Sequence, residues 1–283
     1  MSGTLFVVAT PIGNLEDVTL RALRVLRTVD LIAAEDTRRT ARLLAHHGIS
    51  TPTLSFHQHN IRGRVPQLVA RLQQGASIAL VTDAGTPGVS DPGVELVHAC
   101  VMVGIAVDPV PGVSAPLTAA IASGFPLIPL TILGFAPARA KDRSLWLKNV
   151  SRIENTLTFF EAPHRIARTI VEAASHLGIR QIVVARELTK AHQEFLRGTA
   201  TELSTAFEDA RGEFTVVVGP IVSAGESQKS IDDSAVVADF CRSTEGAGTS
   251  RREAIRAVAK RHQLSARRVY EIVERSKHLS NDQ

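Results

Sequence analysis

Short apolar runs alternate with longer amphipathic stretches through the first half of the chain. Five apolar runs predict buried strands, at residues 4–9, 31–34, 54–56, 78–81 and 106–107. Between these runs, apolar residues recur three to four positions apart, which predicts helices. Strands joined by helices form parallel sheets, so we expect an α/β domain whose strands all end at one edge.

The second half alternates in the same way but includes connections typical of hairpins. Four apolar runs predict strands, at residues 130–135, 157–160, 182–185 and 214–218. Residues 193–197 are placed to pair as a hairpin, and helices are expected up to residue 150, from the turn at 161–165 to residue 177, and over 201–210. This pattern favours a mixed sheet, and the polar, basic stretch that begins at Ala136 indicates a domain boundary near Leu133.

A third region begins with the composition of a linker. Residues 219–232 are polar and contain Ser and Gly, and residues 234–242 predict a short helix. Ser250 and Glu253 form a capping-box pattern for a helix that ends near His262, and Ser265 is placed to cap another that runs to about Lys277. These short helices resemble a helix-turn-helix. The expected domains are therefore 1–133, 134–222 and 223–283.

The composition is that of an ordinary globular protein, with 44% hydrophobic and 21% charged residues. No apolar stretch approaches the ~18 residues of a membrane span, and the N-terminus lacks the basic start of a signal peptide. Cys100 and Cys241 stand far apart and offer neither a disulfide framework nor a zinc motif. We therefore expect a protein of the reducing cytoplasm that does not contact a membrane.

The formal net charge of +4 is unevenly distributed along the chain. Residues 249–278 contain nine Lys and Arg against three Glu, so the rest of the chain is net negative. A basic C-terminal segment indicates an anionic partner there. Aromatic residues make up only 4% of the chain, which argues against a surface that binds nucleic acid by stacking bases.

The stretch LVTDAGTPGVSDPG, residues 80–93, has the chemistry of a ligand-binding turn. A predicted strand stops at Asp83, and the next ten residues contain three Gly and two Pro, so the backbone must turn. Asp91 and Pro92 are placed as the N-cap and first residue of the next helix. Open glycine backbone beside polar Thr86 and Ser90 predicts a ligand site at the strand end, against the alternative of a tight loop with no ligand.

Several common catalytic motifs are missing from the sequence. It contains no G-x-G-x-x-G, P-loop, G-x-S-x-G or H-E-x-x-H string, so dinucleotide, nucleotide, hydrolase and zinc-protease interpretations lose their main support. His57 and His59 could ligate a metal, but no further carboxylate or cysteine has the required spacing. We expect no metal site, and histidines that face solvent or substrate.

Nine strings occur in order along nearly the whole chain: TPIGNLEDVTLRAL, DLIAAEDTR, HQHN, DAGTPGVSDPG, PGVSA, GFAPARAKDR, FFEAPHRI, ARELTK and GEFTVVV. In these strings the chain resembles the tetrapyrrole-methylase-like, or class III, methyltransferases that use S-adenosylmethionine, specifically those that act on small-subunit ribosomal RNA. The resemblance implies two α/β domains with the cofactor in the cleft between them, plus a small C-terminal all-α domain. It also implies a homodimer that methylates the 2'-hydroxyl of a cytidine in the decoding region of 16S rRNA, in the 30S subunit.

The resemblance also implies which residues face the cofactor. Those residues are Pro11, Ala84, Gly85, Thr86, Val89, Ser114, Ala115, Phe160, Glu187 and Leu188. We add Asp83, the polar residue that opens the central loop. Phe160 has the alternative role of a core residue, and Ser114 that of a helix cap.

Methyl transfer from a sulfonium needs positioning, desolvation and an acceptor for the hydroxyl proton. Five polar residues near the strand ends are candidate bases, namely Glu35, Asp36, His57, Glu161 and Lys190. Of these we choose Glu161, Lys190 and His57 as the catalytic residues. For RNA contacts we choose Arg38, Arg39, His59, Asn60, Arg139, Lys141, Arg143 and Arg165, although any single Arg can instead be a solvated surface charge.

Two other functions remain open at this point. The same fold could methylate a tetrapyrrole or another small acceptor, but such an acceptor has no need of a basic tail. The chain could also be a transcription regulator whose helix-turn-helix reads DNA and whose α/β body senses a ligand. The regulator hypothesis predicts sequence-specific binding to duplex DNA, and the order of the motifs favours the RNA methyltransferase.

Overall fold

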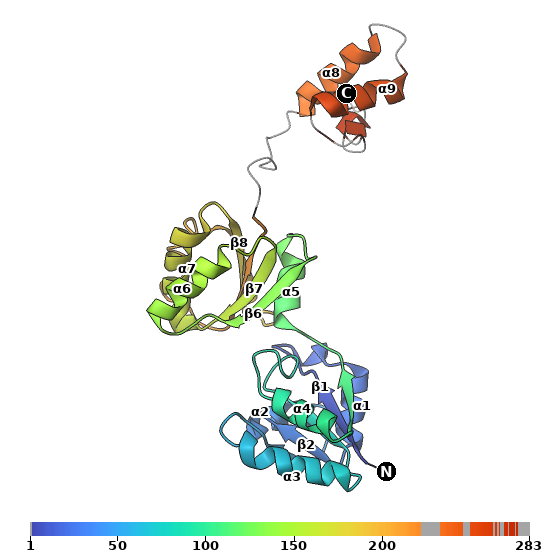
Figure 1. The fold of residues 1–283 in the computed structure, drawn as a ribbon, viewed down its shortest axis with the longest axis vertical. Coiled ribbons are helices and arrows are strands. Elements are labelled where there is room, and N and C mark those ends of the chain that lie inside the picture. The colour runs from blue at the N-terminus through green and yellow to red at the C-terminus, as the bar shows by residue number, and fades with distance from the viewer. Residues whose placement is uncertain are drawn as a thin grey trace. The chain divides into compact units, whose positions relative to one another are not determined.

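The computed structural model describes residues 2–221, 233–245, 250–262, 264, 266, 269–270, 272–274 and 276. The chain forms two compact units, Met1–Ile221 and Val222–Gln283. The larger unit contains two five-stranded sheets, and the smaller unit is helical where it is described (Figure 1). Among the described residues, no helix is both long enough and apolar enough to span a membrane.

The first sheet is entirely parallel, as the alternation of strands and helices predicts. It contains β1 (Thr4–Val8), β2 (Leu31–Ala34), β3 (Thr53–Ser55), β4 (Ile78–Val81) and β5 (Ala106–Val110), in the order β3-β2-β4-β1-β5. The connections contain a short 3-10 helix, η1 (Leu15–Asp17), and four α-helices: α1 (Leu20–Thr28), α2 (Thr37–His46), α3 (Ile61–Gln73) and α4 (Val94–Met102).

Both faces of the first sheet are covered, which explains why its strands are almost continuously apolar. Successive residues of a strand point to opposite faces. In β2, Ile32 and Ala34 pack with Leu26 of α1, whereas Leu31 and Ala33 pack in the cluster that contains Leu68 of α3. The sheet is therefore a rigid platform, and the loops at its carboxyl edge are held from both sides.

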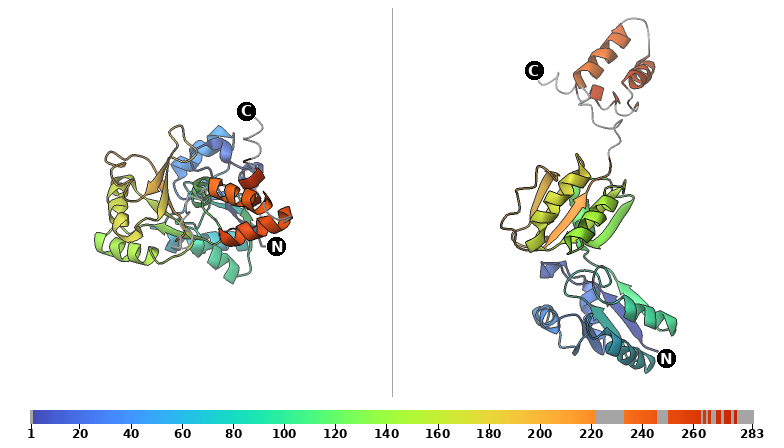
Figure 2. Two further views of the ribbon diagram at one scale, coloured as in Figure 1. Left: turned by 90° about the horizontal axis from the view of Figure 1, so that it is seen from above. Right: turned by 60° about the vertical axis from the view of Figure 1, so that its left-hand side comes forward.

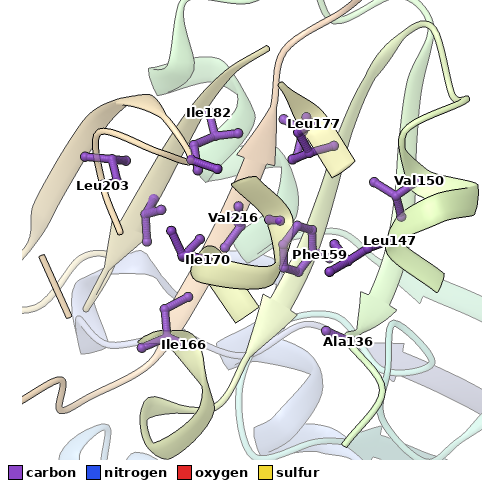
Figure 3. Close-up of a cluster of buried hydrophobic side chains, with 14 of the residues drawn as sticks. Ala136, Leu147, Val150, Phe159, Ile166, Ile170, Leu177, Ile182, Leu203 and Val216 are labelled. Carbon is purple, nitrogen blue, oxygen red and sulfur yellow. The ribbon is translucent and has the colours of Figure 1, made fainter. Parts of the chain in front are cut away.

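The second sheet is mixed, as predicted, in the order β6-β7-β10-β8-β9. It contains β6 (Leu130–Phe135), β7 (Thr156–Glu161), β8 (Gln181–Arg186), β9 (Glu194–Thr199) and β10 (Phe214–Val218). Only β6 and β7 pair in parallel, and the expected hairpin is β8 with β9. Helices α6 (Ala140–Val150) and α7 (Pro163–Leu177) cover one face through the core drawn in Figure 3, which joins Leu147 and Ile170 to Phe159 and Val216.

The other face of this sheet is covered by α5 (Ala115–Ser123), so the predicted boundary near Leu133 needs correction. Ala119 of α5 is fully buried with Val183, Ala185 and Val217 of the second sheet. The ribbon of α5 lies against this sheet in Figure 1, and Figure 2 shows the same ribbon from two further sides. Leu133 itself lies inside β6. The division between the sheets therefore falls after β5, because the apolar face of α5 packs on the second sheet and not on the first.

Asp36 caps α2, because its carboxylate accepts the amide hydrogen of Arg38. Two local expectations differ from the structure. Helix α4 begins at Val94 after Gly93, so Asp91 is not its N-cap. Residues 201–210 form successive turns and no helix, with backbone bonds that mix three- and four-residue spacings.

The smaller unit contains α8 (Asp233–Glu245) and α9 (Arg251–Arg261), which share a core that includes Phe240, Ala254 and Val258. The capping box at Ser250 and Glu253 is present. The predicted linker lies mostly in 222–232, outside the described residues, and so does the predicted cap Ser265. Described residues between 266 and 276 are helical, in agreement with the expected last helix.

Candidate active site

A cavity of about 380 Å³ lies where the loops at the carboxyl edge of the first sheet meet the second sheet. This volume lies within the range of small-molecule sites. From the first half, the lining comes from the loops after β1, β2, β4 and β5, as the sequence predicts, but not from the loop at residues 57–60. From the second half, the lining comes from Phe135, residues 160–163, Leu188 and residues 212–215.

Hydrogen bonds to two neighbouring turns fix the loop after β4, residues 83–91, beside this cavity. Gly85 has a φ of +79° and exchanges backbone hydrogen bonds of 2.8 and 2.9 Å with Thr10. The hydroxyl of Thr86 donates to the carbonyl oxygen of Val113 at 3.1 Å, which ties the loop to the turn before α5. Ser90 also has a positive φ, of 68°, which is uncommon for a residue with a side chain.

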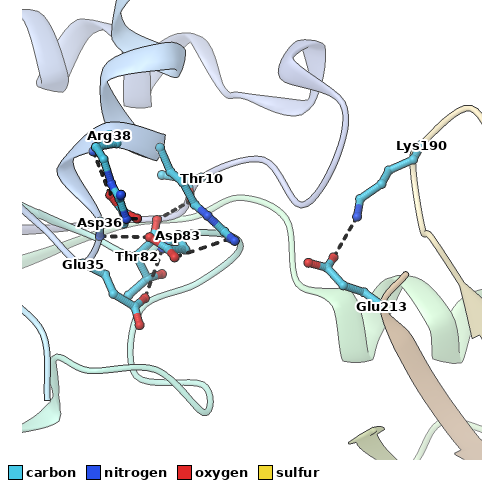
Figure 4. Close-up of polar contacts among 9 residues, drawn as sticks. Thr10, Glu35, Asp36, Arg38, Thr82, Asp83, Lys190 and Glu213 are labelled. Carbon is cyan, nitrogen blue, oxygen red and sulfur yellow. Dashed lines mark hydrogen bonds and ion pairs between the residues drawn. The ribbon is translucent and has the colours of Figure 1, made fainter. Parts of the chain in front are cut away.

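A second loop, residues 187–190, locks onto the turn after β1. The amide of Asn14 donates to the hydroxyl of Thr189 at 3.0 Å. A Cβ atom on Gly13 would lie 2.8 Å from the carbonyl oxygen of Leu188, so only glycine allows this approach. The ammonium of Lys190 bonds to Glu213 at 3.0 Å (Figure 4). It also bonds to Glu187 at 2.8 Å, and the two bonds fix the loop from the other side.

Three acidic residues of the first-sheet loops line the cavity, namely Glu35, Asp83 and Asp91, and Glu161 and Glu213 line it from the second half. Asp83 accepts the amide hydrogen of Asp36 at 2.9 Å and lies 3.5 Å from the guanidinium of Arg39 (Figure 4). Glu35 accepts the amide hydrogen of Asp83 at 3.2 Å, and burial raises the pKa of Glu35.

Asp91 has the most perturbed carboxyl of the three. Its side chain is partly buried, and no hydrogen bond or ion pair reaches its carboxylate from the described residues. Burial, together with the negative charges of Glu35 and Asp83, raises the pKa of Asp91 to about 7. A carboxyl with this pKa exchanges its proton near neutral pH, which makes it chemically different from its neighbours.

The predicted catalytic residue Glu161 is a structural anchor in this fold. Its carboxylate is buried and accepts hydrogen bonds from the amide of Ala162 at 2.7 Å and the hydroxyl of Thr169 at 2.6 Å. It also forms an ion pair with Arg165 at 2.6 Å. Both carboxylate oxygens are therefore already bonded within the protein.

The other predicted bases lie in different environments. Burial alone would lower the pKa of Lys190, but its bonds to Glu187 and Glu213 outweigh this and raise the pKa, so Lys190 remains protonated. The bonds of Asp36 with Arg38 lower the Asp36 pKa to about 2. His57 does not line the cavity, and its Nδ1 is buried without a partner among the described residues.

Most residues expected at the cofactor do line the cavity. They are Asp83, Ala84, Gly85, Thr86, Val89, Ser114, Ala115, Phe160 and Leu188. Pro11 and Glu187 do not line it: Pro11 precedes the lining residue Ile12, and Glu187 braces its loop. The sequence reasoning missed Phe135 and residues 212–215, although the strand ends at β6 and β10 are the signal that could have identified them.

The residues expected at RNA fall into two groups. Arg38, Arg39, His59, Arg139 and Lys141 are exposed, while the side chain of Asn60 bonds to the backbone of Ser55 and His57. The prediction for Arg143 is wrong, because this residue is only 3% exposed and pairs with Glu172 at 2.6 Å. Arg165 is largely buried by its ion pair with Glu161.

The described residues contain no cluster of three or more His, Cys, Asp or Glu able to hold a metal ion. The cavity instead offers apolar walls from Ile12, Val89, Phe160 and Leu188, together with acidic residues from both halves of the larger unit. Such a lining fits a ligand that has both a flat apolar part and a positive charge.

A family model described as tetrapyrrole (corrin/porphyrin) methylases matches residues 4–204. Curated relatives named ribosomal RNA small subunit methyltransferase I match over most of the chain. The relative from Synechocystis is 43% identical, over 95% of this chain and 97% of its own length. The relative from Bacillus subtilis is 40% identical, over 95% and 93%, and the one from Thermotoga maritima is 46% identical, over 76% and 98%.

Solved structures agree on the fold. Cobalt precorrin-4 methyltransferase is 19% identical, with a TM-score of 0.58 over 76% of this chain and 94% of its own. Uroporphyrin-III C-methyltransferase from Thermus thermophilus, in complex with S-adenosylhomocysteine, is 18% identical, with a TM-score of 0.55 over 77% and 97%. The chain is thus a member of the tetrapyrrole methylase family, and its curated relatives named above are ribosomal RNA small subunit methyltransferases I.

Proposed function

We propose that this protein transfers a methyl group from S-adenosylmethionine to the 2'-hydroxyl of a cytidine in the decoding region of 16S rRNA. The observation that carries the proposal is the match, at 43% identity over 95% of the chain, to a curated rRNA small subunit methyltransferase I. The family supports the methyl donor, and the ordered motifs support the ribose target.

The residues that line the cavity are chemically suited to the proposed cofactor, S-adenosylmethionine. When bound, S-adenosylmethionine supplies a methyl group that its sulfonium has already activated. Phe160 and Leu188 provide apolar surface for the adenine, and the first turn of α5, which begins at Ala115, provides backbone amides for the amino-acid end. The carboxylates of Glu35, Asp83 and Asp91 suit the positive charge of the donor.

We assign Asp91 as the acceptor of the ribose hydroxyl proton. A general base works best when its pKa lies near the working pH, and burial places the pKa of Asp91 at about 7. Its carboxylate lines the cavity and is free of bonds to the described residues, whereas those of Glu161 and Asp36 are engaged. A cation in the cavity would lower the pKa of Asp91 and so favour the carboxylate that accepts the proton.

Exposed cations around the cavity are proposed to hold the RNA backbone. Arg38 and Arg39 lie on the first turn of α2, and Arg39 also lines the cavity. Arg139 and Lys141 lie at the start of α6, beyond β6. Phosphate contacts of this kind orient an RNA without reading its sequence, so shape must select the nucleotide. We therefore propose the assembled 30S subunit, in the cytoplasm, as the substrate.

A homodimer is the proposed assembly of this enzyme. Apolar side chains of α5 and of the edge strand β6 are exposed, namely Leu117, Ile121, Ile132 and Phe135. Exposed apolar side chains concentrated on two elements are typical of subunit interfaces. Sedimentation equilibrium of the purified protein tests the dimer, and a monomer at micromolar concentration would contradict it.

The proposed reaction is tested by transfer of labelled methyl to 30S particles from cells that lack this protein. We expect label on one cytidine ribose, and much less label on protein-free rRNA. Equal labelling of both substrates would contradict the choice of the particle. Donor binding without transfer to any RNA would reject the RNA methyltransferase and favour a small acceptor.

A further inference from the structure

Helix α9 presents three exposed cations along one side. Arg252, Arg256 and Lys260 follow one another at four-residue intervals and are all exposed. Side chains four residues apart are neighbours on a helix, about 5–6 Å apart. We call these three residues the α9 cation stripe.

The packing of α9 fixes the direction of this stripe. Ala254, Val258 and Ala259 are buried in the core of the smaller unit, together with Phe240 of α8. The stripe lies outside that buried face, on the part of the helix that meets solvent. The packing of α9 in the core of the smaller unit therefore holds the stripe in an exposed position.

The other cations of the unit that the structure describes are paired with carboxylates, which sets the stripe apart. Arg242 and Arg261 pair with Asp239, and so does His262 when it is protonated, at 2.5 to 3.0 Å; Arg251 pairs with Glu274. Glu253, which lies between Arg252 and Arg256 in sequence, bonds to the backbone and hydroxyl of Ser250 in the capping box. Those bonds, and to a smaller extent the charge of Arg256, lower the pKa of Glu253. Among the described residues, no ion pair or hydrogen bond engages the side chains of the stripe.

The smaller unit also lies outside the part of the chain that the family requires. The family model ends at residue 204, and the Thermotoga maritima relative is matched over 98% of its length by 76% of this chain. The unit Met1–Ile221 accounts for a length of that size and contains the whole cavity. All the described residues that line the cavity belong to the larger unit.

We propose that the α9 cation stripe docks the smaller unit on the phosphate backbone of RNA, separately from the RNA held at the cavity. This inference rests on the proposed function, which makes an RNA the substrate. A row of unpaired, exposed cations is complementary to a polyanion with evenly spaced charges. The stripe carries no aromatic side chain, so it fits phosphates and not stacked bases.

The test replaces the stripe in the full-length protein with Arg252→Gln, Arg256→Gln and Lys260→Gln. Glutamine keeps a good helix propensity, so α9 is retained. The matched control is Arg24→Gln, Arg71→Gln and Arg152→Gln, which removes three exposed cations from the larger unit. Binding to 30S particles and to a fluorescent decoding-region RNA is measured between 50 and 200 mM salt, along with methyl transfer and donor binding.

We expect the stripe variant to bind RNA about tenfold more weakly near 150 mM salt, and its plot of log affinity against log salt to be shallower by about 2–3. Its KM for 30S particles rises while kcat and donor affinity stay unchanged, and the control variant behaves as wild type. An unchanged salt slope, or an equal loss in the control, overturns the proposal. Loss of duplex DNA or protein binding with RNA binding intact also overturns it.

The docking proposal and the proposed reaction fail in different ways. If wild-type protein binds RNA through the stripe but transfers no methyl group, the reaction is wrong and the docking stands. If the stripe variant keeps wild-type RNA affinity and KM while methyl transfer is normal, the docking is wrong and the reaction stands. Donor binding serves as the fold control in each case.

Discussion

The partly buried carboxyl of Asp91 is the residue whose ionisation is most sensitive to its surroundings. Burial and two neighbouring carboxylates raise its pKa to about 7, well above its value in the unfolded chain. Its contribution to stability is full below about pH 4 and is lost as the pH rises through 7, because the unfolded chain releases the proton first. A residue whose ionisation destabilises the fold at neutral pH, as that of Asp91 does, is typical of a functional site.

We predict that Asp91→Asn raises the melting temperature at pH 8 and has little effect near pH 4, since the amide has no proton to lose. Thermal unfolding between pH 4 and pH 8 measures this difference. Methyl transfer should fall by about 10²-fold or more while donor binding persists. Equal melting temperatures across the whole pH range, or full activity, would reject the assigned role.

Gly13 allows the turn after β1 to meet residues 187–190. A Cβ atom there would lie 2.6 Å from the Cγ of Lys190 and 2.8 Å from the carbonyl oxygen of Leu188. We predict that Gly13→Ala lowers the free energy of unfolding by about 1–3 kcal/mol and weakens donor binding, because Leu188 lines the cavity. Urea unfolding and calorimetric titration measure the two effects.

Gly63 supplies the matched control for this substitution. It lies inside α3, and a Cβ atom there would meet nothing within 4 Å. Gly63→Ala should stabilise the protein by about 0.5–1 kcal/mol through helix propensity. If Gly13→Ala and Gly63→Ala have the same free energy of unfolding and the same donor affinity, the close approach at Gly13 contributes neither to stability nor to donor binding.

At the scale of elements, Glu161 joins the end of β7 to the first turns of α7. The cap position of α7 is Ala162, which has no side-chain cap, and Glu161 instead accepts the Ala162 amide and pairs with Arg165. We predict that Glu161→Ala lowers the free energy of unfolding by about 3–5 kcal/mol, since it leaves Arg165 buried and unpaired. Urea unfolding measures this loss.

The exposed residue Arg168, on the same helix, serves as the control. Arg168→Ala should change the free energy of unfolding by less than about 0.5 kcal/mol. A Glu161→Ala variant that keeps wild-type stability but loses methyl transfer would restore Glu161 as a catalytic residue.

The strands were predictable from the sequence where burial in a sheet determines the pattern of apolar residues. Residues 31–34 and 78–81 are apolar throughout because helices cover both faces of their sheet, and they form β2 and β4 as expected. Residues 201–210 also have a helical pattern, with Leu203 and Phe207 buried, yet they form turns. Two apolar anchors four residues apart fit a helix and a run of turns equally well.

The site was predictable in its loops but not in its electrostatics. A glycine-containing turn after a buried strand indicated residues 83–89, and most of these line the cavity. The pKa of Asp91 depends first on its burial and then on the charge of Glu35, which is far away in the sequence, so no local pattern indicates it. Arg143 has the sequence of a surface cation but pairs with Glu172 across two helices, a contact that only the fold creates.

At the scale of the whole molecule, the two units have separate hydrophobic cores. We predict two calorimetric unfolding transitions. S-adenosylhomocysteine at about 100 times its Kd should stabilise the larger unit by about 2.7 kcal/mol and leave the other transition in place, because the cavity lies within Met1–Ile221. A single transition that shifts as a whole would show that the units unfold together.

Among the described residues, the lining of the cavity contains five acidic residues and one guanidinium, that of Arg39. Methyl transfer turns the cationic sulfonium of S-adenosylmethionine into the neutral thioether of S-adenosylhomocysteine. The product therefore lacks the electrostatic attraction to the carboxylates that the donor has. The enzyme should therefore bind S-adenosylmethionine more tightly than S-adenosylhomocysteine, so that new donor replaces the product after each turnover. This preference should grow as Asp91 ionises, so product inhibition should be weaker at pH 8 than at pH 6.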